Sequence, residues 1–305
     1  MMSKDCKNTG AHRAASLAAN PTTSMSNILD FTLIEGIKCF SPKVASAYDD
    51  YPDEGFDVTD EYAETSFWVS ARTRLFKGLV KRNLPPSQKA RFLEIGCGTG
   101  DFIKHLRDDK KLEITGSEVY LKGLVYAKKN QPDVEFIQFD VTEGQIGREF
   151  DMIVAFDVIE HIDDDMAALS NINRMLGNDG VAIISVPQHM FLWGPLDEIV
   201  KHKRRYSRSE LKQKMEASGF KIRYTTSFVF FLFPLMLAAR LFDKKRDNSD
   251  SDQNALSKRV KFSPVVNGVM GFFMRIDEFL VKLGISLPYG GTLVMVAEKG
   301  TPTSR

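Results

Sequence analysis

Cysteine is scarce in this chain of 305 residues, which contains only Cys6, Cys39 and Cys97. An odd number of cysteines spread so far apart supports neither a disulfide framework nor a zinc site, so a reducing, cytoplasmic compartment is expected. An excess of charge of one sign is also lacking, because the formal net charge is +1. Without a strong basic excess the protein has no global electrostatic footprint for nucleic acid, and we expect no nucleic-acid partner.

Long hydrophobic runs are missing as well. No uninterrupted apolar run reaches the roughly 18 to 20 residues that a membrane-spanning helix needs, and the N-terminal residues lack the apolar core of a secretory signal. Residues 1–27 are rich in Ser, Thr, Asn and Ala, with Asp5 as their one acidic residue. We predict that the N-terminal segment, residues 1–45, is largely disordered. An organellar transit segment is the alternative, which Arg13, the single arginine there, supports weakly.

Hydrophobic residues, at 43% of the chain, are sufficient for a large core. Apolar residues recur at helical spacing over 67–84, and Pro85 and Pro86 end that segment. Predicted strands and helices then alternate, which indicates a parallel sheet. Gly177 is placed to close the helix that follows Asp163, and Ser207 with Glu210 has capping-box spacing. The predicted strands are 91–95, 112–117, 134–139, 151–156, 181–186, 221–228 and 291–298, and the predicted helices are 67–84, 101–107, 121–129, 163–176 and 207–218.

A glycine-dense turn follows the first of these strands, where residues 92–100 read Phe-Leu-Glu-Ile-Gly-Cys-Gly-Thr-Gly. A dinucleotide fingerprint would place a pyrophosphate at such a turn. Asp101 comes directly after the glycines, however, and its carboxylate would repel a pyrophosphate. A phosphate-binding loop of the nucleotide-hydrolase kind is excluded because no Gly-Lys-Ser/Thr follows. Glu94 and Asp101 instead suit a ligand that carries positive charge.

Acidic residues also follow the next two strands, at Glu118 and Asp140. With the glycine turn, this series resembles class I S-adenosylmethionine-dependent methyltransferases, particularly the group similar to ubiquinone-biosynthesis O-methyltransferases. The resemblance covers about residues 66–228 and resumes at 292–298. It implies an enzyme of α/β class with a Rossmann-like seven-stranded, mostly parallel sheet, helices on both faces, and a helical insertion before the last, antiparallel strand. The sulfonium and ammonium groups of S-adenosylmethionine are the positive charges that the turn suits.

The resemblance also implies which residues bind S-adenosylmethionine. Glycines of the first motif let the backbone approach the methionine portion, while Glu94, in place of the commoner Asp, holds the amino group. Glu118 would take the two ribose hydroxyls, as suits a bidentate carboxylate. Asp140 would accept from the adenine amine, with Phe139 or Val141 on the ring face. The expected cofactor-binding residues are Glu94, Gly96, Gly98, Gly100, Glu118, Asp140, Val141 and Asp157.

Residues 156–161 match the family's fourth motif, which faces the transferred methyl group. Methyl transfer to a hydroxyl requires an aligned oxygen and removal of its proton, and His161 is the best local candidate for the base. The alternative is a histidine that orients the loop through a hydrogen bond. His202 is a second catalytic candidate. Glu160 and His161 could together help hold a divalent metal, but two adjacent residues are a poor ligand set, so no metal site is expected.

The loop 187–206 resembles the acceptor-side loop of bacterial methyltransferases associated with cell-surface sugars and polyprenyl-linked substrates. Its basic residues predict an anionic small-molecule or lipid-linked acceptor. A basic loop that closes through salt bridges is the alternative. Trp68, on the upstream helix, is expected either to wall the cofactor pocket or to pack in the core. The basic residues are Lys201, Lys203, Arg204, Arg205 and Arg208.

About 60 residues separate the last two predicted strands, so we divide the chain into an N-terminal segment (1–45), a methyltransferase domain (46–228 with 291–300) and an apolar helical insertion (229–290). An insertion that leaves the carboxyl end of a strand should sit over the active site. It has one apolar stretch ahead of Lys244, Lys245 and Arg246, and a second helix near 269–283. A lid or core element, a peripheral membrane contact at the inner face of a membrane, and a homodimer surface all remain open.

The sequence thus predicts methyl transfer from S-adenosylmethionine to oxygen, less readily to nitrogen or carbon. A non-catalytic S-adenosylmethionine-binding module of the same fold is the alternative, and the intact series of acidic residues disfavours it. An oxidoreductase on the same sheet topology is disfavoured by Asp101.

Overall fold

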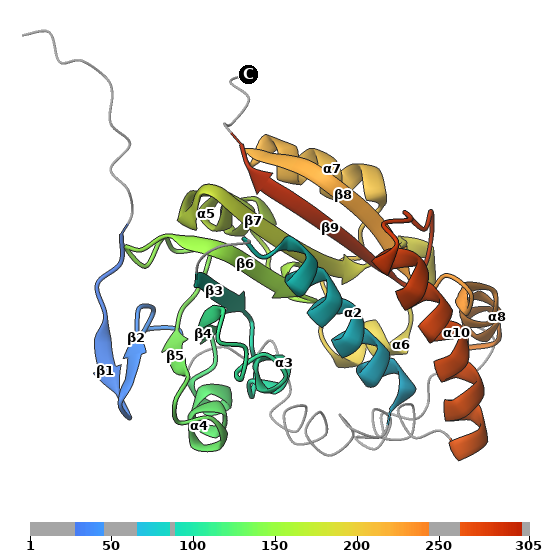
Figure 1. The fold of residues 1–305 in the computed structure, drawn as a ribbon, viewed down its shortest axis with the longest axis horizontal. Coiled ribbons are helices and arrows are strands. Elements are labelled where there is room, and N and C mark those ends of the chain that lie inside the picture. Colours follow the sequence, from blue (N-terminus) through green and yellow to red (C-terminus); the bar gives the residue numbers. More distant parts are fainter. Residues whose placement is uncertain (1–27, 46–65, 86–88, 244–262, 301–305) are drawn as a thin grey trace, which may run out of the picture.

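A nine-stranded sheet runs through the residues that the structure describes (Figure 1). The structure is a computed structural model, and it describes residues 28–45, 66–85, 89–243 and 263–300. The strand order is β1-β2-β5-β4-β3-β6-β7-β9-β8. The strands are β1 (Thr32–Ile34), β2 (Ile37–Cys39), β3 (Ala90–Ile95), β4 (Leu112–Glu118), β5 (Glu135–Gln138), β6 (Phe150–Phe156), β7 (Leu176–Pro187), β8 (Phe220–Phe228) and β9 (Thr292–Lys299).

Neighbouring strands from β2 to β7 pair in parallel, whereas β9 runs antiparallel to both β7 and β8. The strands β3 to β9 confirm the Rossmann-like α/β fold with its antiparallel last strand. The predicted number of strands was too low, because β1 and β2 extend the sheet beyond β5.

The extra strands β1 and β2 form a hairpin within the segment predicted to be largely disordered. Glu35 (φ 52°) and Gly36 (φ 74°) make the tight turn between them, and hairpin turns need positive φ at both central residues. Ile37 and Cys39 are buried and Lys38 between them is exposed, so β2 has the alternation of a strand with one buried face. The prediction of disorder was therefore wrong for residues 32–39. Residues 1–27 lie outside the described part of the chain, as do Lys244, Lys245 and Arg246.

The predicted helices are present, two of them shorter than expected, and the short α6 (Pro195–Ile199) was not predicted. The first helix after the glycine turn is one turn long, and the helix that follows Asp163 ends at Met175. Gly177 does not close that helix, because Leu176 is already extended and begins β7 directly. The helices are α2 (Phe67–Asn83), α3 (Asp101–Lys104), α4 (Leu121–Asn130), α5 (Asp165–Met175), α6 (Pro195–Ile199), α7 (Arg208–Ala217), α8 (Phe233–Asp243) and α10 (Pro264–Lys282), with 3-10 turns η1 (Ile159–His161) and η2 (Met190–Leu192).

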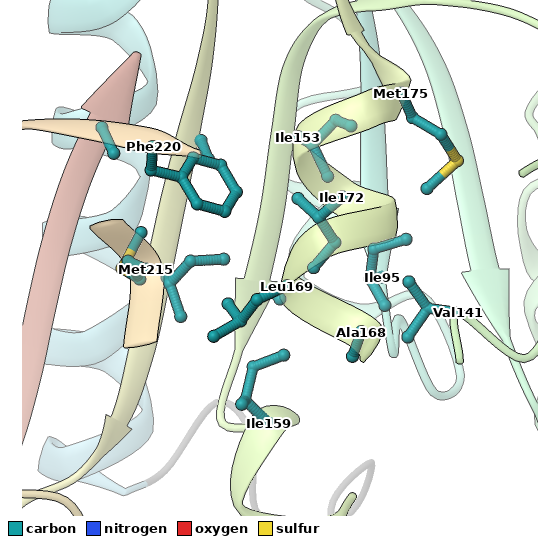
Figure 2. Close-up of a cluster of buried hydrophobic side chains, with 14 of the residues drawn as sticks. Ile95, Val141, Ile153, Ile159, Ala168, Leu169, Ile172, Met175, Met215 and Phe220 are labelled. Carbon is teal, nitrogen blue, oxygen red and sulfur yellow. The ribbon is translucent and has the colours of Figure 1, made fainter. Parts of the chain in front are cut away.

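Helices cover both faces of the sheet. Side chains that alternate along β3 and β6 divide the core into two layers, so that α2 and α10 pack on one face and α5 and α7 on the other (Figure 1). Figure 2 shows the α5 side of this core, where Leu169 and Ile172 lie against Ile95 and Ile153 of the central strands. The sheet is thus fixed from both sides, and its carboxyl edge is left to form a site.

The insertion between β8 and β9 contributes α8 and α10. Helix α10 packs along α2, where the backbone N–H of Phe67 donates to Oδ1 of Asn267 (3.2 Å) and the guanidinium of Arg74 donates to both carboxylate oxygens of Glu278 (2.7 and 2.9 Å). None of the helices in the described ranges is long and apolar enough to cross a membrane.

Candidate active site

A cavity of about 320 Å³ lies at the carboxyl ends of β3, β4 and β6, beneath α2. It brings together most of the residues predicted from the sequence. Asp101 and Phe139 line it as well, which agrees with their place beside the glycine turn and at the end of β5. The predicted residues on its wall are Glu94, Gly96, Gly98, Glu118, Asp140, Val141, Asp157 and His161.

The glycine turn between β3 and α3 needs glycine at all three predicted positions. Gly96 (φ 69°), Gly98 (φ 55°) and Gly100 (φ 83°) have left-handed backbone conformations. A Cβ on Gly96 would lie 2.4 Å from Cγ2 of Val158, so the turn also depends on close packing against the end of β6. Gly100 is not among the described residues that line the cavity, and its carbonyl accepts from the Gln131 side chain (2.9 Å). Its place in the structure is that of a turn former at the start of α3.

Glu94 presents a buried carboxylate to the cavity. Its side chain belongs to a residue only 4% exposed, and Oε2 has no hydrogen-bond partner among the described residues. Burial raises the pKa of Glu94 to about 8, although the nearby Arg72 acts in the opposite direction. A buried carboxylate oxygen without a donor is costly, and a ligand ammonium group would supply both the donor and the charge. This observation fits the cationic ligand that the sequence predicted.

Glu118 is already held by the backbone. Its Oε2 accepts from the N–H of Gly98 (3.0 Å), and Oε1 accepts from the N–H groups of Val119 (2.7 Å) and Tyr120 (3.2 Å). Burial raises the pKa of Glu118, and these hydrogen bonds oppose that rise. Because a carboxylate oxygen has two lone pairs, Oε2 keeps one for a hydroxyl, while Oε1 has none left unless one backbone bond is released. The carboxylate is therefore preorganised at the cavity wall.

Asp140 and Val141 form the far wall of the cavity, at the end of β5. Oδ1 of Asp140 accepts from the backbone N–H (2.8 Å) and the hydroxyl (2.7 Å) of Thr142, which fixes a tight turn. The side chain of Asn171 on α5 donates to the carbonyl of Val141 (2.8 Å). The N–H of Asp140 donates to the hydroxyl of Ser41, so the N-terminal strands support this wall.

Asp157 sits at a bend where β6 ends, with a positive φ of 57°. Its carboxylate accepts from the Ser185 hydroxyl (2.9 Å) and pairs with the Arg72 guanidinium (2.6 Å). Arg72 also donates to the carbonyl of Phe156 (3.1 Å) and lies over the Phe76 ring. The ion pair ties α2 to the sheet across the cavity. Sequence reasoning gave Arg72 no partner, because the two halves of the pair are far apart in the chain.

Trp68 does not wall the cavity. Its ring stacks on Phe228 at 6.2 Å, within the α2 side of the core, so the core alternative is the one that the structure supports. The cavity wall of α2 consists of Val69, Arg72, Thr73 and Phe76.

Glu160, His161 and His202 form a second polar cluster beside the cavity. Their ligand atoms lie within 4.8 Å of one another. Glu160 is fully buried and neither of its carboxylate oxygens has a partner among the described residues, and burial raises the pKa of Glu160 well above its usual range. Carboxylate and imidazole groups are ligands for divalent cations. His202 thus adds a third group to the pair that looked too poor a ligand set in the sequence.

His161 lines the cavity from η1, whereas His202 is not among the described residues that line it. Burial, and then the neighbouring His202, lower the pKa of His161 to about 4. Nδ1 of His202 lies 2.8 Å from Oδ1 of Asp197, and its Nε2 lies 3.8 Å from Oε1 of Glu160. Burial alone would raise the pKa of Asp197, but hydrogen bonds from His202 and Arg205 outweigh it and hold that pKa at about 2.

The basic loop is closed by ion pairs within the chain. Arg205 donates to both oxygens of Asp197 (2.7 and 3.0 Å), and Arg204 pairs with Asp165 (3.1 Å). Lys203 pairs with Asp163, and Arg208 donates to the carbonyl of Leu287 and to Ser227. The salt-bridged alternative is therefore what the structure supports, and recognition of an anionic acceptor by this loop stays a prediction.

The insertion contributes no residue of its described parts, 229–243 and 263–290, to the lining of this cavity. Helix α8 instead packs beside the loop after β7, where the Phe233 ring lies 5.8 Å from His189 and 6.4 Å from Phe191. A Cβ on Gly194 would lie 2.5 Å from the Arg240 guanidinium. The described residues therefore do not take the expected position over the active site, because the chain turns from β8 toward the α2 face of the sheet.

Comparison with known proteins agrees with this geometry. A family model described as "Methyltransferase domain" matches residues 68–225. A ubiquinone biosynthesis O-methyltransferase from Rickettsia typhi is 24% identical over 110 residues, which is 35% of this chain and 44% of that protein. A probable S-adenosylmethionine-dependent methyltransferase from Mycolicibacterium smegmatis is 25% identical over 166 residues, 53% of this chain and 63% of that protein. The chain thus spans about half the length of the curated relatives it matches.

Solved structures share the fold at low identity. Phosphoethanolamine N-methyltransferase 2 from Haemonchus contortus, in complex with S-adenosylmethionine, has a TM-score of 0.54 at 17% identity, over 83% of this chain and 58% of that chain. The [4+2]-cyclase SpnF has a TM-score of 0.52 at 20% identity, over 78% of this chain and 85% of that one. A cyclase and a methyltransferase on one fold show that the fold alone does not decide the reaction.

Proposed function

The chain belongs to the methyltransferase domain family, as a class I enzyme that uses S-adenosylmethionine, and on this premise we propose that it methylates an oxygen atom of a small-molecule or lipid-linked acceptor. The observation that carries the proposal is His161, a neutral histidine on the wall of a cavity that Glu94 also lines, with its buried Oε2 unpartnered among the described residues. The imidazole of His161 can accept a proton, and the carboxylate of Glu94 can bind a cationic group.

The cofactor would be held by the residues that line the glycine-turn side of the cavity. Oε2 of Glu94 would accept from its ammonium group, and the free lone pair of Glu118 from a ribose hydroxyl. The backbone of Gly96 and Gly98 would lie along the methionine portion, with Asp140 and Val141 beside the adenine. Gly100 shapes the turn and Asp157 holds Arg72 in place. S-adenosylmethionine supplies a methyl group on a positively charged sulfur, which makes that carbon electrophilic.

His161 would take the proton that an acceptor hydroxyl must lose. A pKa of about 4 leaves the imidazole neutral at pH 7, with a lone pair available. Such a weak base is adequate because an oxygen that gains a methyl group before losing its proton becomes strongly acidic. Curated relatives with O-methyltransferase names favour oxygen as the acceptor atom.

His202 would act as a positioning residue, since it does not line the cavity. Asp197 fixes its Nδ1, and the ring contacts His161 edge to face at 4.8 Å between centroids. Truncating His202 would loosen His161 and remove the second imidazole that depresses its pKa. The pH profile of His202→Gln should therefore shift toward higher pH, which loss of packing alone would not cause.

The test is incubation of purified protein with isotopically labelled S-adenosylmethionine and cell extract, followed by mass spectrometry of labelled species. His161→Gln should slow labelling by about 10²- to 10⁴-fold while S-adenosylhomocysteine affinity stays within about twofold. His105→Gln is the matched control, because His105 is exposed and outside the cavity lining. Label on a nitrogen or carbon atom would overturn the oxygen assignment.

The same assay distinguishes an enzyme from a non-catalytic binding module, and a base from a metal ligand. Cofactor binding without a labelled product in any extract would favour a non-catalytic S-adenosylmethionine-binding module. A second measurement repeats the assay with a chelator, because Glu160, His161 and His202 offer ligands for a divalent cation. Activity lost on chelation and restored by a divalent cation would make His161 a metal ligand rather than the base.

A further inference from the structure

Helix α10 buries two acidic residues beside its core-facing apolar side chains and exposes other large apolar side chains. A helix on the surface of a globular protein buries its apolar side chains and exposes its charged ones. In α10 the carboxylates of Asp277 and Glu278 are buried, at 1% and 4% exposure, whereas Phe272 and Phe279 are 61% and 58% exposed. The helix has therefore turned its acidic residues toward the protein, and Phe272 and Phe279 toward the outside, while Phe273 packs against the core.

Specific bonds fix this orientation. The carboxylate of Asp277 accepts from the backbone N–H groups of Phe230 (2.7 Å) and Phe231 (3.4 Å), just before α8. Glu278 accepts two hydrogen bonds from Arg74 on α2. Rotating α10 to bury its phenylalanines would break these bonds and leave backbone donors and a guanidinium without partners. The apolar side is thus held outward by the polar side.

The exposed apolar residues form one continuous stripe along α10. The positions 265, 269, 272, 276, 279 and 283 are separated by alternating steps of four and three, which is the spacing of a single helix face. Ile276 is half-buried, and the other five are 48% to 76% exposed. At 1.5 Å per residue the stripe is about 27 Å long. An apolar patch of this length is more than a scatter of surface residues.

A second group of exposed apolar side chains lies at α8, which Figure 1 places beside α10 at one end of the sheet. Leu235 is 54% exposed and Phe231 is 40% exposed. Phe233 of α8 contacts the ring of Tyr289 at 5.1 Å, and Tyr289 is itself 42% exposed. The bonds from Phe230 and Phe231 to Asp277 hold the start of this segment against the inner side of α10.

The exposed charges of α10 have one sign. The exposed charged side chains of α10 are Arg275 and Lys282, because its two acidic residues face inward. An apolar stripe flanked by cations matches an anionic lipid surface, where the stripe enters the acyl boundary and the cations meet the headgroups. A second copy seated on the same stripe would bring these cations together with no exposed acid of α10 to pair with them.

We propose that α10, together with the apolar side chains around α8, docks this protein on an anionic lipid surface, with α10 lying in the plane of the interface. The helix does not need to span the bilayer, in agreement with its composition. This docking is independent of the proposed methyl acceptor, since it rests on a surface outside the cavity.

The test is cosedimentation of the purified full chain with vesicles of phosphatidylcholine, with and without phosphatidylserine, in the absence of S-adenosylmethionine and acceptor. We expect binding to the phosphatidylserine vesicles that weakens in high salt. F272E/F279E should reduce the partition coefficient by more than about tenfold. R275E/K282E should abolish the preference for phosphatidylserine. The matched control is Leu33→Glu, because Leu33 is 66% exposed on β1, away from this surface.

Three results would overturn the proposal. The first is wild-type protein that stays in the supernatant with both vesicles at low salt. The second is a lipid-free dimer, measured by analytical ultracentrifugation, that F272E/F279E dissociates, since the stripe would then belong to a second copy. The third is a large fall in melting temperature of lipid-free F272E/F279E, which would show that another part of the chain covers the stripe. None of these results bears on methyl transfer, which the labelling experiment measures separately.

Discussion

At the carboxyl ends of β3 and β6 the chain buries carboxylates without giving all of them partners, whereas in the insertion both carboxylates of α10 are satisfied and large apolar side chains face water. Glu94 and Glu160 have buried oxygens that accept no hydrogen bond within the described chain. Asp277 and Glu278 accept two each, while Phe272 and Phe279 are more than half exposed.

Each region fits a different kind of ligand. A buried oxygen without a donor is stabilised by a polar or cationic ligand, and an exposed apolar stripe is stabilised by an apolar phase. The two proposals follow this contrast, with a charged small molecule as the ligand of the cavity and an anionic lipid surface as the partner of the insertion. The following substitutions test this contrast, beginning with the largest expected effect.

Asp197→Asn should have the largest effect, because it removes a fully buried charge beside the cavity. Arg205 would remain buried without its counterion, and loss of one partner of a buried pair costs about 3 to 5 kcal/mol of unfolding free energy. The wild-type contribution is present above the ordinary pKa of 3.8 and is lost as the pH falls toward about 2, since folding lowers this pKa. Denaturant titration at neutral and acidic pH measures both effects. If the variant lost less than about 1 kcal/mol of unfolding free energy at neutral pH, Asp197 would not be what holds the basic loop in place.

Gly96→Ala, measured together with a glycine substitution in α10, compares the stability lost in the glycine turn with that lost in the insertion. Alanine at Gly96 would have a left-handed backbone and a Cβ 2.4 Å from Val158, so we expect about 2 to 4 kcal/mol of destabilisation and weaker cofactor binding. Gly268→Ala is the matched control, because nothing lies within 4 Å of its added Cβ in α10. That change should be neutral or stabilise by up to about 1 kcal/mol. Thermal unfolding of both variants is the measurement, and equal shifts would contradict the contrast.

Glu94→Gln should lower S-adenosylmethionine affinity by about 10- to 100-fold and remove its pH dependence. In the folded protein Glu94 retains a proton up to about pH 8, so a cationic ligand should bind more tightly as the pH rises through that value. For the ligand-free protein the sign is opposite: the raised pKa favours folding most below 4.5, and stability declines as the pH rises from 4.5 to about 8. Calorimetry in buffers of different ionisation enthalpy would detect the released proton. Identical pH profiles for wild type and variant would rule out Glu94 as the group responsible.

Glu278→Gln should have the smallest effect on stability. Its partner Arg74 has a side chain that is 39% exposed, so water can replace part of the lost interaction, and we expect about 1 to 2 kcal/mol. Chemical unfolding of both variants, Glu278→Gln and Asp197→Asn, compares the free energy of unfolding that each bidentate carboxylate–arginine pair contributes. If the two losses were equal, burial would not be the factor that separates the two regions.

Much of the cavity could be predicted from the sequence because its residues follow a local rule. Glu94, Glu118 and Asp140 each stand at the end of a buried strand, and parallel strands bring their carboxyl ends to one edge. Strand and helix alternation, with the glycine turn, therefore specified both the sheet and the cofactor side of the site.

The rest depended on partners distant in the chain. Helical spacing identified the apolar stripe of α10, but the inward turn of that helix is set by Arg74, about two hundred residues away, and by backbone donors before α8. The strands β1 and β2 have three residues each, too few for a periodic signal, and their pairing depends on β5. His202 joins Glu160 only because Asp197 and Arg205 fold the loop back.

The position of β9 between β7 and β8 has a consequence for synthesis of the chain. Among the described strands β9 is the only partner of β8, and it is made after α8 and α10. While the ribosome extends the insertion, β8 has no strand to pair with and one edge of β7 stays open, which are conditions that favour aggregation. The nascent chain therefore carries two unpaired strand edges until its last strand is available, and a chaperone would protect it most during this stage.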